Sequence, residues 1–359
     1  MGDKGSHRQG ASPVYAEAGV DIDAAGKTVP LLARLAKTTY GREVLSGVGG
    51  FAGLFDLGSL GLRQPVLVSG ADGVGTKLKV AQQMGVLDTV GIDCVAMNVD
   101  DVVCVGAKPL FFLDYIALGK HDRGLIEQLV RGLAEGCSRA GCALLGGETA
   151  QMPGFYDEGE FELAGFAVGV VERDRIVDGS EVRPGDAIVG LASSGLHSNG
   201  YSLVRRVLLE QGKLELGQYV PDFGRTLGEE LLEPTRIYAP LVTEYLSRYE
   251  VHGIAHITGG GIFENIPRIL PESCQALLRR GTWEEHSVFG FIQHHGRLSD
   301  EEMFRTFNMG IGMTLIVPPD SAEACAGWFE QQGIRACVIG EIRVSRDAGR
   351  KSVEVEGLR

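Results

Sequence analysis

The sequence predicts an α/β (α+β) protein with two domains. Strand-like apolar runs alternate with amphipathic helical runs along most of the chain. Several strand-like runs end in glycine-rich segments, as in α/β folds that bind ligands at strand ends. The charged stretch 172–186 contains Pro184-Gly185 and interrupts this pattern. We therefore expect a polar, disordered tail over 1–14, a first domain over 15–174 and a second domain over 175–359.

The first domain is predicted to start with a helix and to continue as alternating strands and helices. Its expected elements are a helix ending at 37, a strand over 65–72, helices over 76–84 and 88–105, a strand over 110–118, a helix from 121 or 122 to 140, and strands over 143–145 and 161–172. In the helix over 88–105, Val95, Val99 and Val102 recur at helical spacing. Gly141 is expected to end the helix before it.

The second domain repeats the alternation of strands and helices. Its expected elements are strands over 188–191, 254–257, 313–317 and 336–344, and helices over 201–209, 227–246, 262–269, 300–307 and 322–331. The helix over 227–246 is expected to be interrupted at Pro234 and Pro240.

Composition excludes several classes of protein. The formal net charge is −13 and the pI is near 5.2, which argues against a general nucleic-acid or membrane-surface binder. The seven cysteines are odd in number and form no Cys-x-x-Cys, which favours reduced thiols and a cytoplasmic protein. No apolar run reaches membrane-spanning length.

The first chemical motif is the segment 70–77, which follows a strand-like run. Its candidate ligand-binding residues are Gly70, Asp72, Gly73, Gly75, Thr76 and Lys77. Glycines let a backbone turn tightly and approach a ligand, and a hydroxyl, a cation and a carboxylate suit a phosphate bound with a divalent metal. The order Thr-Lys excludes a P-loop, which ends in Lys-Ser/Thr. An ordinary strand-to-helix turn explains the segment equally well.

Two acidic clusters follow. Asp93 and Asp100 lie seven residues apart and share a helix face, with Asp101 turned about 100° away. Glu148 follows Gly146-Gly147 at a predicted strand end. Solvated acids and a plain turn are the competing interpretations.

A metal ion follows from electrostatics if these acids converge. If Asp72, Asp101 and Glu148 meet near phosphates, like charges ~4 Å apart repel by about 4 kcal/mol at an effective permittivity of ~20. Lys77 alone cannot offset several such pairs. The three carboxylates are therefore candidate ligands of Mg²⁺.

The fourth cluster is Ser-Ser-Gly-Leu-His-Ser-Asn-Gly over 193–200, between a strand and a helix. His197 and Asn199 supply donors at a helix N-terminus, where anions bind. Ser198 or Asn199 could instead be a helix cap. His256 begins a second segment of the same kind, which continues to Gly261.

Together these segments resemble the phosphoribosylformylglycinamidine cyclo-ligases, or aminoimidazole ribonucleotide synthetases. The segments that carry the resemblance are 18–23, 70–77, 98–106, 109–115, 146–154, 193–205, 256–261 and 307–313. The resemblance implies ATP-dependent ring closure of formylglycinamidine ribonucleotide to aminoimidazole ribonucleotide, with release of ADP and phosphate. It also implies a cytoplasmic homodimer in which the N-terminal domain binds ATP and its mixed sheet forms a dimeric β-barrel, beside a C-terminal α/β sandwich.

The resemblance also implies site residues. Asp72 and Asp101 look like ligands of the metal and the ATP phosphates, and Thr76 and Lys77 lie near those phosphates. Catalytic roles fall on His197, Asn199, Asp101 and Glu148, with Glu148 as a metal or substrate carboxylate. Because Asp100-Asp101 stands where Asn-Asp is expected, the essential acid is open between the two.

Other ATP-using relatives with this fold are the alternatives. Selenophosphate synthetases use an N-terminal cysteine or selenocysteine, whereas no cysteine here precedes Cys94. Thiamine monophosphate kinases share the phosphate-binding acids but lack the pattern at 197–200. An inactive nucleotide-binding paralogue is the non-enzymatic alternative, and the intact acids and His197 weigh against it.

Overall fold

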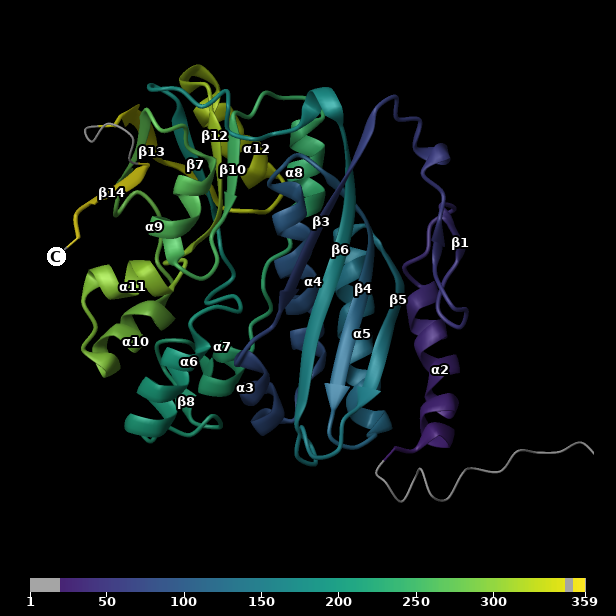
Figure 1. Ribbon diagram of the computed structural model, residues 1–359. Coiled ribbons are helices and arrows are strands. Elements are labelled where there is room, and N and C mark those ends of the chain that lie inside the picture. The colour runs from purple at the N-terminus through teal and green to yellow at the C-terminus, as the bar shows by residue number, and fades with distance from the viewer. Residues whose placement is uncertain (1–19, 346–350, 359) are drawn as a thin grey trace, which may run out of the picture.

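The computed structural model describes residues 20–345 and 351–358, and the predicted tail 1–14 lies outside them. Two sheets stand side by side, with helices packed against each (Figure 1). This confirms the predicted mixed α/β architecture. Within the described residues, no helix is long and apolar enough to cross a membrane.

The first sheet has four strands in the order β3-β6-β4-β5. Its strands are β3 (Pro65–Gly73), β4 (Lys108–Leu118), β5 (Ala143–Gln151) and β6 (Phe161–Glu172). β6 pairs antiparallel with β3 and β4, and β4 pairs parallel with β5. Helices α3 (Lys77–Met84), α4 (Asp88–Val103) and α5 (Arg123–Ala140) follow β3 and β4. α4 packs on one face of this sheet, and α5 packs against α4.

α4 is almost wholly buried because it lies between the first sheet and the second half of the molecule (Figure 1). Its crossing with α5 is close at Gly132, where a Cβ would stand 1.9 Å from the Asp88 carbonyl oxygen. Only glycine fits there. The acids of α4 are therefore held in place by packing on two sides.

The second sheet has six strands in the order β10-β12-β7-β13-β11-β14. Its strands are β7 (Ala187–Ala192), β10 (Gly253–His256), β11 (Cys274–Arg279), β12 (Ile311–Val317), β13 (Ala336–Val344) and β14 (Ser352–Glu356). All pairs are antiparallel except β11 with β14. β7 is buried on both faces, as its apolar sequence predicts.

The helices of the second half lie around this sheet and below it (Figure 1). The helical elements are α6 (Tyr201–Val204), continued by the π-helix η3 (Arg205–Gln211), α7 (Leu227–Leu231), α8 (Ala239–Leu246), α9 (Gly261–Asn265), η4 (Ile266–Ile269), α10 (Ser287–Gly296), α11 (Asp300–Thr306), η5 (Pro319–Ser321) and α12 (Ala322–Gln331). The break between α7 and α8 confirms the predicted interruption at Pro234, whereas the one predicted at Pro240 is wrong, because Pro240 lies in the first turn of α8, where its missing N–H costs no helical hydrogen bond.

One long helix, α2, and several short elements complete the described chain. They are α2 (Ile22–Lys37), β1 (Val44–Ser46), β2 (Leu54–Phe55), η1 (Gly58–Leu60), η2 (Arg173–Arg175), β8 (Tyr219–Val220) and β9 (Arg225–Thr226). α2 packs against α5 and β5, beyond one edge of the first sheet (Figure 1).

The structure corrects several predicted elements. The strand expected to end at 145 runs to Gln151, because its pairing with β4 continues to Leu118. Gly146-Gly147 therefore lie within β5, and Gly70 to Gly73 lie within β3, ahead of the turn. Strands β1, β2, β8, β9, β11 and β14 and helix α10 were not predicted. β14 is short and alternates charged residues with valines, and its pairing with β11 makes it a strand.

Candidate functional site

Two carboxylates and a histidine meet where β3, α4 and β10 approach one another. Asp72 lies near the end of β3, Asp101 on α4 and His256 at the end of β10. His256 Nδ1 lies 2.9 Å from Asp101 Oδ1. The histidine side chain is 2% exposed and that of Asp101 is 48% exposed. The cluster therefore joins both halves of the chain and leaves one carboxylate open to a ligand.

The charges in this cluster influence one another. Burial raises the pKa of Asp72, and the negative charge of Asp101 raises it further. Burial alone would lower the pKa of His256, but its hydrogen bond with Asp101 and the charges of Asp100, Asp101 and Asp72 raise it above its ordinary value. Asp72 and Asp101 are thus close enough to repel, as the sequence predicted for them.

Asp100 has a different role from its neighbour. Its carboxyl is wholly buried, and its Oδ1 accepts hydrogen bonds from Tyr238 N and Ala239 N, each 2.9 Å long. Burial raises its pKa to about 7. Asp100 therefore holds the start of α8, and Asp101 is the acid that faces the cluster. This separation supports Asp101 over Asp100 as the functional acid.

His197 lies in the loop 193–200, which follows β7. Its side chain is buried, and its backbone has φ of 61°, a left-handed conformation uncommon for histidine. Its Nε2 accepts a hydrogen bond from Ser194 N at 3.1 Å. Burial holds the pKa of His197 well below its ordinary value, and the charge of His256 adds to this effect. The ring is therefore neutral with its proton on Nδ1, which has no hydrogen-bond partner among the described residues.

The predicted phosphate-binding residues of the glycine-rich segment divide into two groups. Gly75 and Thr76 are exposed in the turn after β3, and Gly75 has φ of 72°. Thr76 Oγ1 lies 3.1 Å from Ser202 Oγ, at the start of α6. Gly70 and Gly73 lie inside β3. The backbone of Gly70 lies close to α4, and that of Gly73 lies close to β6. Gly75 and Thr76 in the turn are exposed and present their backbone to a ligand.

Asn199 and Lys77 lie deeper than a simple ligand site would place them. Asn199 is half-buried, and its Nδ2 lies 4.0 Å from Met97 Sδ on α4. Lys77 is completely buried in an ion pair with Asp93. Its ammonium faces away from solvent, so it does not reach a ligand in this structure.

Glu148 is separated from the other two predicted metal ligands. Across the sheet, Asp72 pairs with Gly165, Gly165 pairs with Asp114, and Glu148 is on the strand beyond. Three steps of about 4.8 Å put roughly 14 Å between Asp72 and Glu148. Glu148 also pairs with Tyr115, which is exposed on the face away from α4. Within one chain, Asp101 is paired with His256 and not with Glu148.

Glu148 instead lines a cavity of about 370 Å³ beside α2. Thr28 on α2 and His121 before α5 line the same cavity, and Thr28 Oγ1 lies 3.1 Å from His121 Nε2. Within residues 20–345 and 351–358, no three His, Cys, Asp or Glu side chains form a group that could hold a metal ion.

A second cavity, of about 420 Å³, adjoins the Asp101–His256 pair. Arg268 and Asn265, near the end of α9, line it together with those two residues. His256 Nε2 is buried there and has no hydrogen-bond partner in the part of the chain that the structure describes. The space is large enough for part of a small-molecule ligand.

Sequence reasoning missed His256 as a site residue, although it noted the glycine-rich segment that His256 begins. The signal was its place at a strand end, the same place that singled out the other motifs. It also missed the partners of Asp93 and Asp100. The predicted shared face of these two acids is confirmed, because both bind the segment 235–239.

Family models match both halves of the chain. The family model described as "AIR synthase related protein, N-terminal domain" matches residues 56–171, and that described as "AIR synthase related protein, C-terminal domain" matches residues 183–351. The chain belongs to the AIR synthase related family.

Its curated relatives are more specific. A protein of Geobacillus kaustophilus (strain HTA426) named phosphoribosylformylglycinamidine cyclo-ligase is 55% identical over 328 residues, which cover 91% of this chain and 95% of that protein. A protein of the same name from Pseudothermotoga lettingae is also 55% identical, over 91% of this chain and 96% of that protein. The resemblance inferred from the motifs is confirmed.

Solved structures share the fold at lower identity. A thiamine-monophosphate kinase from Stenotrophomonas maltophilia K279a has a TM-score of 0.67 at 21% identity, covering 91% of this chain and 96% of that one. The hydrogenase maturation protein HypE, in complex with ATP, has a TM-score of 0.66 at 17% identity, and the match covers 95% of this chain and 94% of that one. These likenesses show the fold alone.

Proposed function

We propose that this chain catalyses the ATP-dependent ring closure of formylglycinamidine ribonucleotide to aminoimidazole ribonucleotide in purine biosynthesis. The main support is sequence identity: over 91% of its length, the chain is 55% identical to relatives named phosphoribosylformylglycinamidine cyclo-ligase. The cluster of Asp72, Asp101 and His256 supports the proposal, because it joins residues of both halves at one junction.

The reaction has two bond-forming steps. The formyl amide oxygen of the substrate attacks the terminal phosphorus of ATP, and ADP leaves. A substrate nitrogen then attacks the activated carbon and closes the ring, and phosphate leaves with the former amide oxygen. In the second step negative charge develops on the departing phosphate oxygen beside the former amide carbon, so donors fixed near the amide lower the barrier of that step.

His197 and Asn199 are the proposed groups near the reacting amide. His197 is neutral and keeps a proton on Nδ1 that no described residue accepts. Such a nitrogen can donate a hydrogen bond to a developing negative charge without first losing a partner. The side chain of Asn199 follows it on the same loop and supplies an amide donor.

Asp72 and Asp101 fit a Mg²⁺ ion, since two mutually repelling carboxylates are the ligands that this ion prefers. When bound, the ion would neutralise the charge of the ATP phosphates. The backbone around Gly73 and Gly75 and the hydroxyl of Thr76 are the proposed phosphate contacts. Because Glu148 lies roughly 14 Å from Asp72, it is proposed as a carboxylate that contacts the substrate from the cavity beside α2.

Exposed apolar side chains on the first sheet support a proposed homodimer with a shared β-barrel. Leu67 on β3, Tyr115 on β4 and Phe166 on β6 are 58%, 40% and 39% exposed on the face away from α4. A second copy of the same sheet would cover these side chains. We also propose a cytoplasmic location and the division of the described chain near residue 175.

An assay of ADP release tests the proposed function. With formylglycinamidine ribonucleotide, ATP and magnesium, the enzyme should release ADP and form the imidazole product. Selenide and thiamine monophosphate serve as control substrates and should give no turnover. ADP release with a control substrate alone would refute the proposed activity, and full turnover in excess chelator would refute the metal requirement.

A further inference from the structure

The ammonium of Lys77 is sealed at the boundary between the two halves of the chain. Lys77 and Asp93 have side chains that are 0% exposed. Lys77 Nζ lies 2.8 Å from Asp93 Oδ2, and it donates to the carbonyl oxygens of His197 at 3.1 Å and Glu233 at 2.7 Å. A lysine ammonium has three donors, so these contacts use all of them.

Asp93 extends the contact to a second segment of the C-terminal half. Its Oδ1 accepts hydrogen bonds from Thr235 N and Thr235 Oγ1, both 2.7 Å long. Thr235 Oγ1 in turn lies 3.0 Å from Ser198 Oγ, one residue beyond His197. The buried pair therefore contacts both the loop 193–200 and the segment 233–235.

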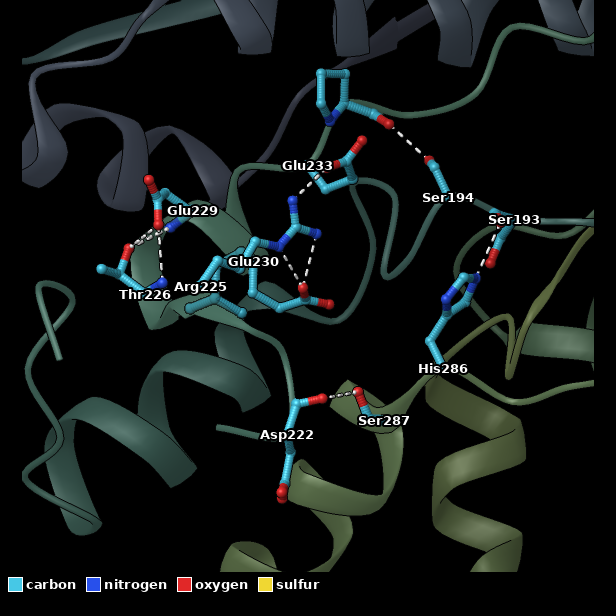
Figure 2. Close-up of polar contacts among 12 residues, drawn as sticks. Ser193, Ser194, Asp222, Arg225, Thr226, Glu229, Glu230, Glu233, His286 and Ser287 are labelled. Atoms are coloured by element: carbon cyan, nitrogen blue, oxygen red, sulfur yellow. Dashed lines mark hydrogen bonds and ion pairs between the residues drawn. The ribbon is translucent and has the colours of Figure 1, made fainter. Parts of the chain in front are cut away.

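Further polar contacts hold the loop 193–200 and the segment 233–235 (Figure 2). Arg225 forms ion pairs with the carboxylates of Glu230 and Glu233. Ser194 donates a 2.6 Å hydrogen bond to the carbonyl oxygen of Pro234. The segment 233–235 thus has contacts besides those with Lys77 and Asp93, and one of them ties it to the loop that carries His197.

We propose that Lys77 and Asp93 are positioning residues, which hold the His197 loop in its active geometry from the N-terminal half and do not contact the ATP phosphates. The expected loss of catalysis rests on the proposed function, whereas the role of the pair in holding the loop does not. The backbone of His197 has φ of 61°, which persists only where surrounding contacts enforce it. Lys77 binds the carbonyl of that same residue and so supplies one of these contacts.

The energetic cost of the pair supports this assignment. Two charges without solvent contact lose their hydration, and a buried ion pair is weak evidence for stability as such. Such a pair can instead specify one arrangement of the segments that it contacts. Here those segments are the loop that carries the proposed catalytic histidine and the segment 233–235.

The test compares two variants with the wild-type protein. Lys77→Met combined with Asp93→Asn removes both charges and keeps an acceptor for Thr235. Thr235→Val keeps the ion pair but removes the hydroxyl contacts to Asp93 and Ser198. Three quantities are measured: hydrogen exchange of the amides in 193–200, affinity for a non-hydrolysable ATP analogue with magnesium, and kcat and KM for formylglycinamidine ribonucleotide.

The double variant should exchange the amides of 193–200 at least tenfold faster and lose at least tenfold in kcat, while its nucleotide Kd changes less than threefold. Thr235→Val should show the same pattern with smaller factors and little change in KM. A tenfold weaker nucleotide affinity with unchanged exchange would make Lys77 a phosphate ligand and overturn the proposal. Faster exchange with unchanged kcat would also overturn it.

The two proposals fail in different ways. Circular dichroism shows whether the double variant folds. If it does not, the Thr235→Val variant is the test. Amide hydrogen exchange in 193–200 and a kcat that both match the wild-type values in that variant would overturn the positioning role. If the wild-type enzyme does not close the ring, the proposed function fails. The exchange and nucleotide measurements then still show whether Lys77 holds the loop or binds phosphate.

Discussion

Two acid–base pairs link the halves of this molecule, and they differ chiefly in exposure. Asp101 and His256 meet beside a cavity, and the carboxylate is 48% exposed. Asp93 lies about two turns before Asp101 on α4. Its side chain and that of Lys77, on α3, are 0% exposed. The first pair can accept a ligand, whereas the second has its donors and acceptors occupied by the chain. The contrast teaches that the exposure of a charged pair decides whether it is open to a ligand or closed off by the chain.

Breaking the exposed pair should have the largest effect on activity. Asp101→Asn should lower kcat by about 100-fold or more, because it removes a negative charge proposed to hold the cation that neutralises the ATP phosphates. Steady-state assays of the purified variant, with a melting curve to verify folding, check this result.

Asp100→Asn is the matched control for that variant. Burial raises the pKa of Asp100 to about 7, and an asparagine oxygen can still accept from Tyr238 N and Ala239 N. We expect a loss of less than about tenfold in kcat, since the residue contacts only the start of α8. A larger loss in Asp100→Asn than in Asp101→Asn would mean that the wrong acid has been chosen.

Removing the histidine that the buried pair helps to hold should separate chemistry from binding. His197→Ala should lower kcat by about 100-fold, within the range for a proton-transferring or charge-stabilising group. Its affinity for ATP should change much less, as equilibrium titration with the nucleotide would show. Comparable losses in both would assign His197 to the ATP subsite.

Breaking the buried pair should affect stability more than breaking an exposed pair. Asp93→Leu leaves the Lys77 ammonium buried without its carboxylate, and we expect a loss of about 3–5 kcal/mol in unfolding free energy. Glu127→Gln on α5 breaks the exposed pair with Arg131 and should cost at most about 0.5 kcal/mol. Urea denaturation measures both, and equal losses would contradict the comparison.

The smallest expected effect is a pH dependence at a third pair, inside the C-terminal half. Burial alone would lower the pKa of His252, but hydrogen bonds with Asp186 at 2.8 Å and Glu250 at 2.9 Å raise it above 6.5. A raised folded-state pKa stabilises the fold fully below the unfolded-state pKa, and this contribution disappears as pH rises through the folded-state pKa.

His252→Gln should therefore be most destabilised, relative to wild type, in acid. Urea denaturation of both proteins from about pH 5.5 to 8.5 should show the difference in unfolding free energy shrinking as pH rises. A difference that grows with pH would contradict the assigned direction of the shift.

The sequence predicted the larger elements well and the contacts between halves poorly. The valine spacing of α4 and the acid spacing of Asp93 and Asp100 follow from helical geometry, so both could be read from the chain. The hydrogen-bond partners of those acids could not be predicted, because Thr235 and Tyr238 are more than 130 residues away in the sequence. Glu148 shows the same limit, since the length and register of β5 come from its pairing with β4.

Lys77 illustrates why the site was harder to predict than the fold. A lysine after glycines and a threonine has the composition of a phosphate site, and nothing local distinguishes that role from a buried contact. Its exposure depends on the loop 193–200 and the segment 233–235, which lie far along the chain. His256 was missed for a related reason: its partner Asp101 is 155 residues away.

The most direct test of the account is the magnesium dependence of nucleotide binding, measured by calorimetry with a non-hydrolysable ATP analogue. Wild-type protein should bind the analogue tightly with magnesium and weakly in excess chelator. In Asp101→Asn this difference should largely disappear, while the fold persists. If the variant keeps the wild-type magnesium dependence, then Asp101 does not hold the cation and the proposed cluster is not the ATP site.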